Sequence, residues 1–170
     1  TEVSLNHNDQ KIRQDASDMV SLMTPVVKSL FSDLGMEITS DAMQIFGGYG
    51  YTKDQGIEQL YRDNRITPIY EGTNSVQAAD LVFRKLSNKN GNIINKFLNI
   101  IKSEANLNNE KLTPFVEQFN YYIDILSKFS EWSIEKAKTN KNDVSAAAND
   151  YLKTLGYVSL AFAWTKVLNI

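Results

Sequence analysis

The sequence predicts an all-α protein, and two observations support this fold class. Apolar residues recur every three or four positions over most of the 170 residues, which is the spacing that gathers side chains on one face of a helix. No comparable run alternates apolar and polar residues with the period of two that is typical of a half-buried strand. We therefore expect helices throughout, without an internal repeat or a low-complexity segment.

The first helical pattern leads up to Phe46. Its apolar positions are Met19, Leu22, Met23, Val26, Val27, Leu30, Phe31, Leu34, Ile38, Ala42, Ile45 and Phe46. Thr24 followed by Pro25 fits an N-cap and a proline in the first turn, so we predict that one helix ends there and another runs from Pro25 to Phe46. Gly35 is an internal weak point of this second helix, because glycine has a low helix propensity.

The glycine-rich segment GGYGY at 47–51 is predicted to end this helix, because glycine adopts left-handed backbone angles at little cost. A shorter helix is expected from Gln55 to Arg65. It is interrupted at Ile66-Thr67-Pro68, because proline disfavours helical backbone at the preceding residue. Tyr70-Glu71-Gly72-Thr73 is predicted to be a turn, and its last residue can cap a helix that runs to Leu86.

The second half of the chain follows a polar segment, SNKNGN at 87–92, which we take as the boundary between two units, 1–88 and 89–170. Three further helical patterns follow this segment. They cover 93–101, 114–137 with Thr113 as the N-cap, and 144–168. These helices show no catalytic constellation, and we assign them to packing and to contacts between subunits.

Composition excludes several classes of function. The net charge is -2 and the pI is about 5.4, so nothing favours a nucleic acid or an anionic membrane as partner. The absence of cysteine excludes thiol catalysis and disulfides, and with His7 as the one histidine we expect no metal site. The polar N-terminus and the lack of a long apolar run favour a cytoplasmic protein.

One segment, from Asp41 to Leu86, carries residues in a distinctive order. Gln44 precedes Gly47-Gly48 by three positions, Arg62-Asp63 follows, and the sequence Ile-Tyr-Glu-Gly-Thr comes at 69–73. Together these pieces resemble the C-terminal signature of the acyl-CoA dehydrogenase family, whose catalytic glutamate lies in such an I-Y-E-G-T segment. The resemblance covers roughly residues 15–86 and implies the C-terminal helical bundle of that fold, with additional C-terminal helices.

The resemblance implies that Glu71 is the catalytic base. Dehydrogenation of an acyl-CoA to an enoyl-CoA removes the α-hydrogen as a proton and the β-hydrogen as a hydride, and a carboxylate in an apolar site is suited to the first step. In the family, the backbone N–H of this glutamate and a flavin hydroxyl stabilise the thioester oxygen. Gly72 is expected to leave room for the substrate thioester.

The same resemblance implies that FAD is the cofactor. Thr73 and Ser75 are expected to contact the flavin, while Gln44, Gly47 and Gly48 match the segment that meets the adenosine part of an FAD bound mainly to a neighbouring subunit. A homodimer or homotetramer follows from this assignment, with electron-transfer flavoprotein as the expected electron acceptor.

Other residues of the segment are expected to be structural. We interpret Arg62-Asp63 as an ion pair that fixes the short helix, and part of the role of Arg62 could also lie near the cofactor. The aromatic side chains of the segment are expected to serve core and interface packing rather than to form a flavin site. These are Phe46, Tyr49, Tyr51 and Tyr61.

The resemblance also sets expectations about the whole enzyme. The family has an N-terminal helical domain and a β-domain that this sequence lacks, so we expect a fragment that alone binds FAD weakly and does not turn over. The helical tail and LMTPVVKSLFSDLGME at 22–37 are similar to a subgroup that includes 3-(methylthio)propanoyl-CoA dehydrogenase-like enzymes.

Alternative functions remain open at this stage. The chain could be a non-catalytic helical oligomerisation or interaction module descended from such an enzyme, or part of an acyl-CoA oxidase that passes its electrons to oxygen. A related DNA-binding branch of the family uses a basic C-terminal surface, and the acidic balance and scattered lysines argue against it here.

Overall fold

The computed structural model describes residues 1–86, 92–104 and 113–168. Every regular element in these ranges is helical, which confirms the predicted all-α fold. The α-helices are α1 Glu2–Asn6, α2 Gln10–Ile45, α3 Gly48–Tyr51, α4 Ile57–Asn64, α5 Asn74–Asp80, α6 Asn92–Glu104, α7 Thr113–Thr139 and α8 Lys141–Leu168. A 3-10 turn, Lys53–Gln55, precedes α4, and a π-helical turn, Leu81–Lys85, continues α5.

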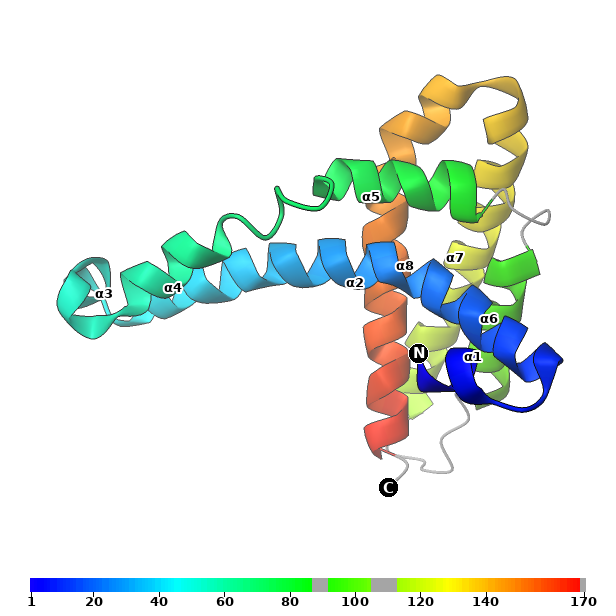
Figure 1. Ribbon diagram of the computed structural model, residues 1–170, viewed down its shortest axis with the longest axis horizontal. Helices are drawn as coiled ribbons and strands as arrows, with labels where there is room; N and C mark the ends of the chain where they lie inside the picture. The colour runs from blue at the N-terminus through cyan, green and yellow to red at the C-terminus, as the bar shows by residue number, and fades with distance from the viewer. Residues whose placement is uncertain (87–91, 105–112, 169–170) are drawn as a thin grey trace.

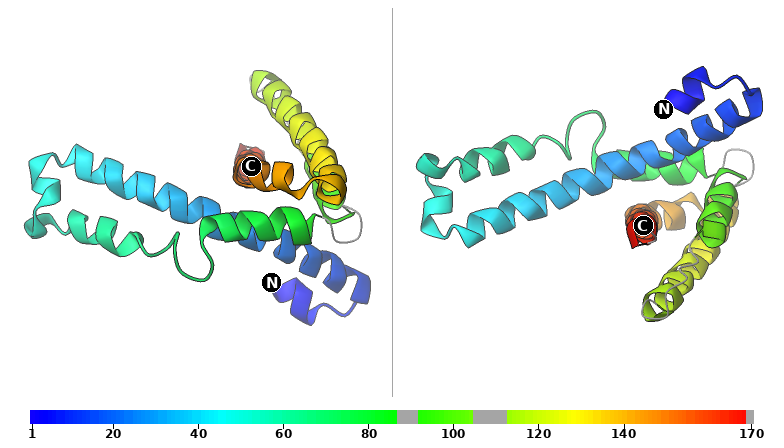
Figure 2. Two further views of the ribbon diagram at one scale, coloured as in Figure 1. Left: turned by 90° about the horizontal axis from the view of Figure 1, so that it is seen from above. Right: turned by 90° about the horizontal axis from the view of Figure 1, so that it is seen from below.

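The helices form a bundle with a long projecting arm (Figures 1 and 2). The first half of α2 packs with α5, α6 and α8 in the bundle, and α7 packs on α6 and α8. The second half of α2 extends outward. α3 forms the tip of the arm, and α4 returns along α2 toward the bundle (Figure 1). The chain from α2 to α5 is therefore a hairpin whose return limb contains the predicted catalytic turn.

α2 runs without a break through Pro25, so the predicted helix boundary is wrong. The Thr24 hydroxyl donates to the Val20 carbonyl at 2.6 Å inside the helix instead of capping a new one. Proline removes one main-chain hydrogen bond and crowds the preceding turn. Leu22, Val26 and the proline itself are buried, and this burial on both sides offsets the cost of continuing the helix.

Gly35 has a packing role that its helix propensity did not reveal. A Cβ atom there would lie 2.9 Å from the Asn64 side-chain nitrogen, so the glycine lets the end of α4 approach α2. At the tip of the arm, a Cβ atom on Gly50 would lie 2.5 Å from the Met43 carbonyl oxygen. Small residues thus set the spacing of the two limbs of the arm.

The bundle has one hydrophobic core to which both halves of the chain contribute. Buried side chains from α2 and α5 pack with those of the last three helices, for example Leu22, Ala78, Ile94, Leu126 and Leu155. The predicted break at 87–91 lies outside the described residues, and the division into units 1–88 and 89–170 stays a prediction. α6 continues to Glu104, Thr113 is the first residue of α7 rather than its cap, and α8 begins at Lys141.

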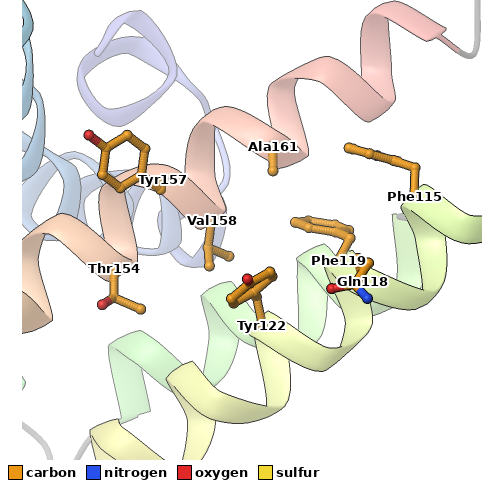
Figure 3. Close-up of a pocket in the computed structure, with 8 residues that line it drawn as sticks. All are labelled: Phe115, Gln118, Phe119, Tyr122, Thr154, Tyr157, Val158 and Ala161. Atoms are coloured by element: carbon orange, nitrogen blue, oxygen red, sulfur yellow. The ribbon is translucent and has the colours of Figure 1, made fainter.

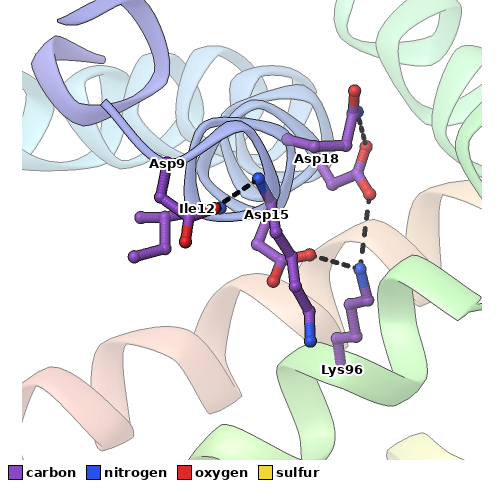
Figure 4. A network of polar contacts seen from close by, with 7 residues as sticks. Asp9, Ile12, Asp15, Asp18 and Lys96 are labelled. Atoms are coloured by element: carbon purple, nitrogen blue, oxygen red, sulfur yellow. Dashed lines mark hydrogen bonds and ion pairs between the residues drawn. The ribbon is translucent and has the colours of Figure 1, made fainter. Parts of the chain in front are cut away.

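Polar contacts join α6 to α2 and α7 to α8. Lys96 of α6 lies between two carboxylates of α2, with its Nζ 2.5 Å from Asp15 Oδ1 and 3.7 Å from Asp18 Oδ2 (Figure 4). The hydrogen bond to Asp15 raises the pKa of Lys96. Between α7 and α8, the buried Tyr151 hydroxyl and Ser130 Oγ are 2.7 Å apart. No helix among the described residues is long and apolar enough to cross a membrane.

Candidate active site

The helix is interrupted after α4 as predicted, and residues 66–73 connect α4 to α5, with the predicted turn Tyr70-Glu71-Gly72-Thr73 directly before α5. The backbone N–H groups of Ile69 and Tyr70 both donate to the Ile66 carbonyl, at 2.9 and 3.0 Å, and Asn74 N–H donates to the Pro68 carbonyl at 3.3 Å. Glu71 has a φ of 54°, and it is the one non-glycine residue with positive φ among the described residues. An L-residue in this region carries backbone strain, which persists only where surrounding contacts enforce it.

Thr73 caps α5, as the sequence predicted. Its side-chain oxygen accepts from the Val76 N–H at 3.4 Å. Gln77, one turn into the helix, reaches back so that its Nε2 donates to the Glu71 carbonyl at 3.0 Å. The helix then widens into a π-turn, in which Leu86 N–H donates to the Leu81 carbonyl at 2.9 Å.

Glu71 is one of the residues that line an open pocket of about 280 Å³ between the turn and α2. The other lining residues are Val27, Lys28, Phe31, Ser32, Asn64, Thr67 and Tyr70. Phe31 and Tyr70 supply apolar surface, and both are partly exposed. The pocket thus offers a carboxylate beside apolar surface, which is the combination that removal of a proton from carbon requires.

The backbone of the turn leaves donors free. Among the described residues, the N–H groups of Glu71, Gly72 and Thr73 have no hydrogen-bond partner. The Thr73 hydroxyl uses an acceptor position in the cap, so its O–H remains available to donate. Ser75 is exposed. These groups suit the carbonyl oxygens and ring nitrogens of a flavin and the oxygen of a thioester.

The other predicted cofactor residues lie elsewhere, at the tip of the arm. Gln44, Gly47 and Gly48 are all exposed, and Gly47 has a φ of 59° and ends α2 as predicted. α3 is at the far end of the arm, whereas α5 starts beside the bundle (Figure 1). One chain therefore does not bring the two groups of predicted FAD contacts together.

The expected ion pair of Arg62 and Asp63 is weak. Arg62 Nη1 is 4.0 Å from Asp63 Oδ1, and its Nε is 3.4 Å from Glu58 Oε2. Because both members of the expected pair are largely exposed, the pair does not fix α4. Asn64, which lies against Gly35, makes the close contact with α2 instead.

The aromatic residues of the arm do not form part of a core within this chain. Tyr49 and Tyr51 are 73% and 80% exposed, and Phe46 and Tyr61 are also exposed. The expectation of core packing is wrong for these four residues, because no described helix covers their side chains. The expectation of interface packing stays a prediction.

A larger pocket, of about 640 Å³, lies between α7 and α8 (Figure 3). Its lining is mainly aromatic and aliphatic, with Gln118 and Thr154 as polar members. The remaining lining residues are Phe115, Phe119, Tyr122, Tyr157, Val158 and Ala161. None of them belongs to the turn around Glu71.

No group of His, Cys, Asp and Glu residues suited to hold a metal ion occurs in the part of the chain that is described.

Comparison with known families defines the class of protein. Residues 4–86 match the family described as "Acyl-CoA dehydrogenase, C-terminal domain", and residues 92–170 match "Acetyl-CoA dehydrogenase C-terminal like". The two matches leave few residues of the chain uncovered. The chain therefore belongs to the acyl-CoA dehydrogenase family.

Several curated proteins of this family are similar to the chain. The 3-methylmercaptopropionyl-CoA dehydrogenase of Ruegeria pomeroyi is 38% identical over 95 residues, which are 56% of this chain and 16% of that protein. The butyryl-CoA dehydrogenase of Syntrophomonas wolfei is 33% identical over 107 residues, or 63% of this chain and 17% of that protein. The cyclohexane-1-carbonyl-CoA dehydrogenase of Geobacter metallireducens is 50% identical over 50 residues, which are 29% of this chain and 13% of that protein. The chain thus matches less than a fifth of the length of each of these relatives.

Proposed function

We propose that this chain supplies the proton-abstracting carboxylate of an FAD-dependent acyl-CoA dehydrogenase, which converts an acyl-CoA thioester to a trans-2-enoyl-CoA. The observation that carries the proposal is the conformation of Glu71. Glu71 has a strained backbone conformation and lines an open pocket, and its own N–H has no hydrogen-bond partner among the described residues. The names of the relatives, all acyl-CoA dehydrogenases, support the reaction class.

In this proposal Glu71 acts twice. Its carboxylate accepts the α-proton of the thioester, and its backbone N–H donates to the thioester oxygen as negative charge develops there. Stabilising that charge makes the α-carbon acidic enough for a carboxylate to act as base. In the proposal Gly72 leaves room for the thioester, and its φ of 84° is a backbone angle that glycine adopts without strain.

FAD fits the donors of the site. Thr73 and Ser75 would contact the flavin, and Gln44, Gly47 and Gly48 would contact the adenosine part of an FAD held mainly by a second subunit. When bound, FAD supplies the acceptor for the β-hydride. The two groups lie at different ends of the arm (Figure 1), and this separation supports a homodimer or homotetramer in which each group contacts the FAD of a different subunit.

We further propose that the isolated chain binds FAD weakly and does not turn over. Glu71, Thr73 and Ser75 are exposed, and the described residues do not enclose a flavin. Electron-transfer flavoprotein is the proposed electron acceptor, and the cytoplasm is the proposed location.

Replacing Glu71 with glutamine tests the function in an FAD-loaded protein that contains this chain. The substitution keeps the size and the backbone N–H but removes the base, so turnover should fall by about 100- to 10,000-fold while FAD stays bound. Glu37→Gln, on an exposed carboxylate of α2, is the matched control and should keep full turnover. Undiminished turnover in Glu71→Gln would remove the basis of the proposal.

Two other functions predict different results in the same protein. A non-catalytic helical module would carry no flavin after purification, even when FAD is supplied. An acyl-CoA oxidase would release hydrogen peroxide when it is mixed with an acyl-CoA in air. The proposed dehydrogenase instead reduces an artificial electron acceptor and releases little peroxide.

A further inference from the structure

We infer that Lys28 and Asn74 are positioning residues that hold the Glu71 turn against α2. This inference rests on the proposed function, because positioning matters only if Glu71 acts on a substrate. The two side chains meet between α2 and the start of α5, directly behind the turn. Lys28 also lines the pocket that Glu71 lines.

Lys28 ties the turn to α2 through its ammonium group. Its Nζ donates to the Gly72 carbonyl at 2.7 Å and to Asn74 Oδ1 at 2.9 Å. The side chain is half-buried, and the bonded carbonyl is 44 positions along the chain. Hydrogen bonds from a charged donor are stronger than those between neutral groups. The carbonyl of the residue after Glu71 is thereby fixed to a long helix.

Asn74 adds a second set of contacts to the same face of α2. Its Nδ2 is 2.7 Å from Asp33 Oδ1, 2.9 Å from Ser32 Oγ and 3.2 Å from the Ser29 carbonyl oxygen. Lys28 requires an acceptor and Asp33 requires a donor, so the amide can face them in one orientation only. A side chain of this shape, with one acceptor and one donor end, is therefore specified at position 74.

The contacts explain how the unfavourable backbone of Glu71 persists. Its own carbonyl is held by Gln77, the next carbonyl by Lys28, and the start of α5 by Asn74. Without the two contacts to α2, the turn can relax toward negative φ, which re-aims both the carboxylate and the N–H. Displacement of a catalytic group by about 1 Å can cost about 100-fold in rate.

The test uses Lys28→Met and Asn74→Ala in an FAD-loaded protein that contains this chain. Each change should raise the amide hydrogen-exchange rate of a peptide covering residues 69–74 and lower kcat by about 10- to 100-fold, with a much smaller change in KM. Lys85→Met is the matched control. Lys85 Nζ also bonds to α2, at 2.6 Å from Ser21 Oγ, but lies away from the turn.

The control should lose stability without faster exchange at 69–74 and without loss of kcat. The inference is overturned if Lys28→Met and Asn74→Ala behave like Lys85→Met. If one of the two variants does not fold, the other decides the outcome. Glu71→Gln separates this inference from the proposed function: retained turnover there rejects the function, whereas faster exchange in Lys28→Met still shows that the lysine holds the turn.

Discussion

At the scale of single residues, the site depends on the backbone angles of two neighbours. Glu71 and Gly72 have φ values of 54° and 84°, and only glycine adopts such angles without strain. Holding Glu71 there costs about 1–3 kcal/mol. The hydrogen bonds from Lys28 and Gln77 to the two carbonyls offset part of this cost.

Gly72→Ala should strain the turn further. The new Cβ atom would lie 3.2 Å from Gln77 Nε2, the group that holds the Glu71 carbonyl, and φ would remain unfavourable. We expect the free energy of unfolding to fall by about 1–2 kcal/mol in urea denaturation, with loss of turnover. Gly48→Ala is the stability control, because its φ is not positive and a Cβ atom there meets no atom within 4 Å. Equal effects in both variants would contradict this account.

The residues of the turn could be predicted from sequence, but the residues that hold the turn against α2 could not. The Ile-Tyr-Glu-Gly-Thr segment and the Thr73 cap are local patterns. Lys28 and Asn74 meet across 46 positions, and a lysine on a helix gives no local signal of such a partner. The same limit applies to Gly35, whose contact with Asn64 depends on how the arm folds back.

At the scale of elements, tertiary packing determined the structure at positions where the local sequence pattern was ambiguous. Proline inside a helix costs about 3 kcal/mol, and the sequence pattern therefore predicted a break at Pro25. Burial of Leu22, Val26 and Leu30, each of about 1.5–3 kcal/mol, outweighs that cost. The helix periodicity predicted the longer helices, but it predicted neither α1 nor α3. The helix ends and the π-turn at Leu81–Lys85 depend on tertiary contacts.

The buried Tyr151 in the contact between α7 and α8 should make the stability of the protein depend on pH. Burial raises the pKa of Tyr151 above its ordinary value, so above about pH 10 the unfolded chain releases this proton while the folded protein retains it. Stability from this group is complete below pH 10 and declines as pH rises. The free energy of unfolding, measured by denaturation at pH 8 and at pH 11, should fall less between these two pH values for Tyr151→Phe than for the parent protein.

Tyr121→Phe provides the comparison for this pH effect. Tyr121 lies on α7 but is exposed, so its loss should leave the alkaline decline unchanged. Tyr151→Phe also removes the bond to Ser130, which should cost about 1 kcal/mol at pH 8. An alkaline decline as steep as that of the parent would show that Tyr151 does not cause it.

At the scale of the whole molecule, the arm exposes apolar side chains that a soluble surface seldom carries together. Ile38, Ile45, Tyr49, Tyr51 and Leu60 are all largely exposed. Apolar side chains that gather on an exposed face mark interaction surfaces, and these five all belong to the arm. The proposed subunit contact at the arm would cover them and would bring Gln44, Gly47 and Gly48 to a neighbouring cofactor.

Ile45→Lys should weaken self-association of a protein that contains this chain. The residue is 84% exposed, so a charge there costs the monomer little but would be buried in the proposed contact. Sedimentation velocity should show a shift toward smaller species and a lower FAD content. Ile100→Lys, on an exposed position of α6, is the control, and an equal shift in both would argue against the arm as the contact.

Because α2 is unbroken, a small rotation at its base would move the tip of the arm as a rigid body. From Pro25 to Ile45 the helix advances about 30 Å, so a tilt of about 5° at its base swings the glycine tip by about 2.6 Å. On the other side of Pro25, Lys96 holds the start of α2 in the bundle through Asp15 and Asp18. Small changes in the far helices are therefore magnified at the place where this protein would touch its neighbour's nucleotide.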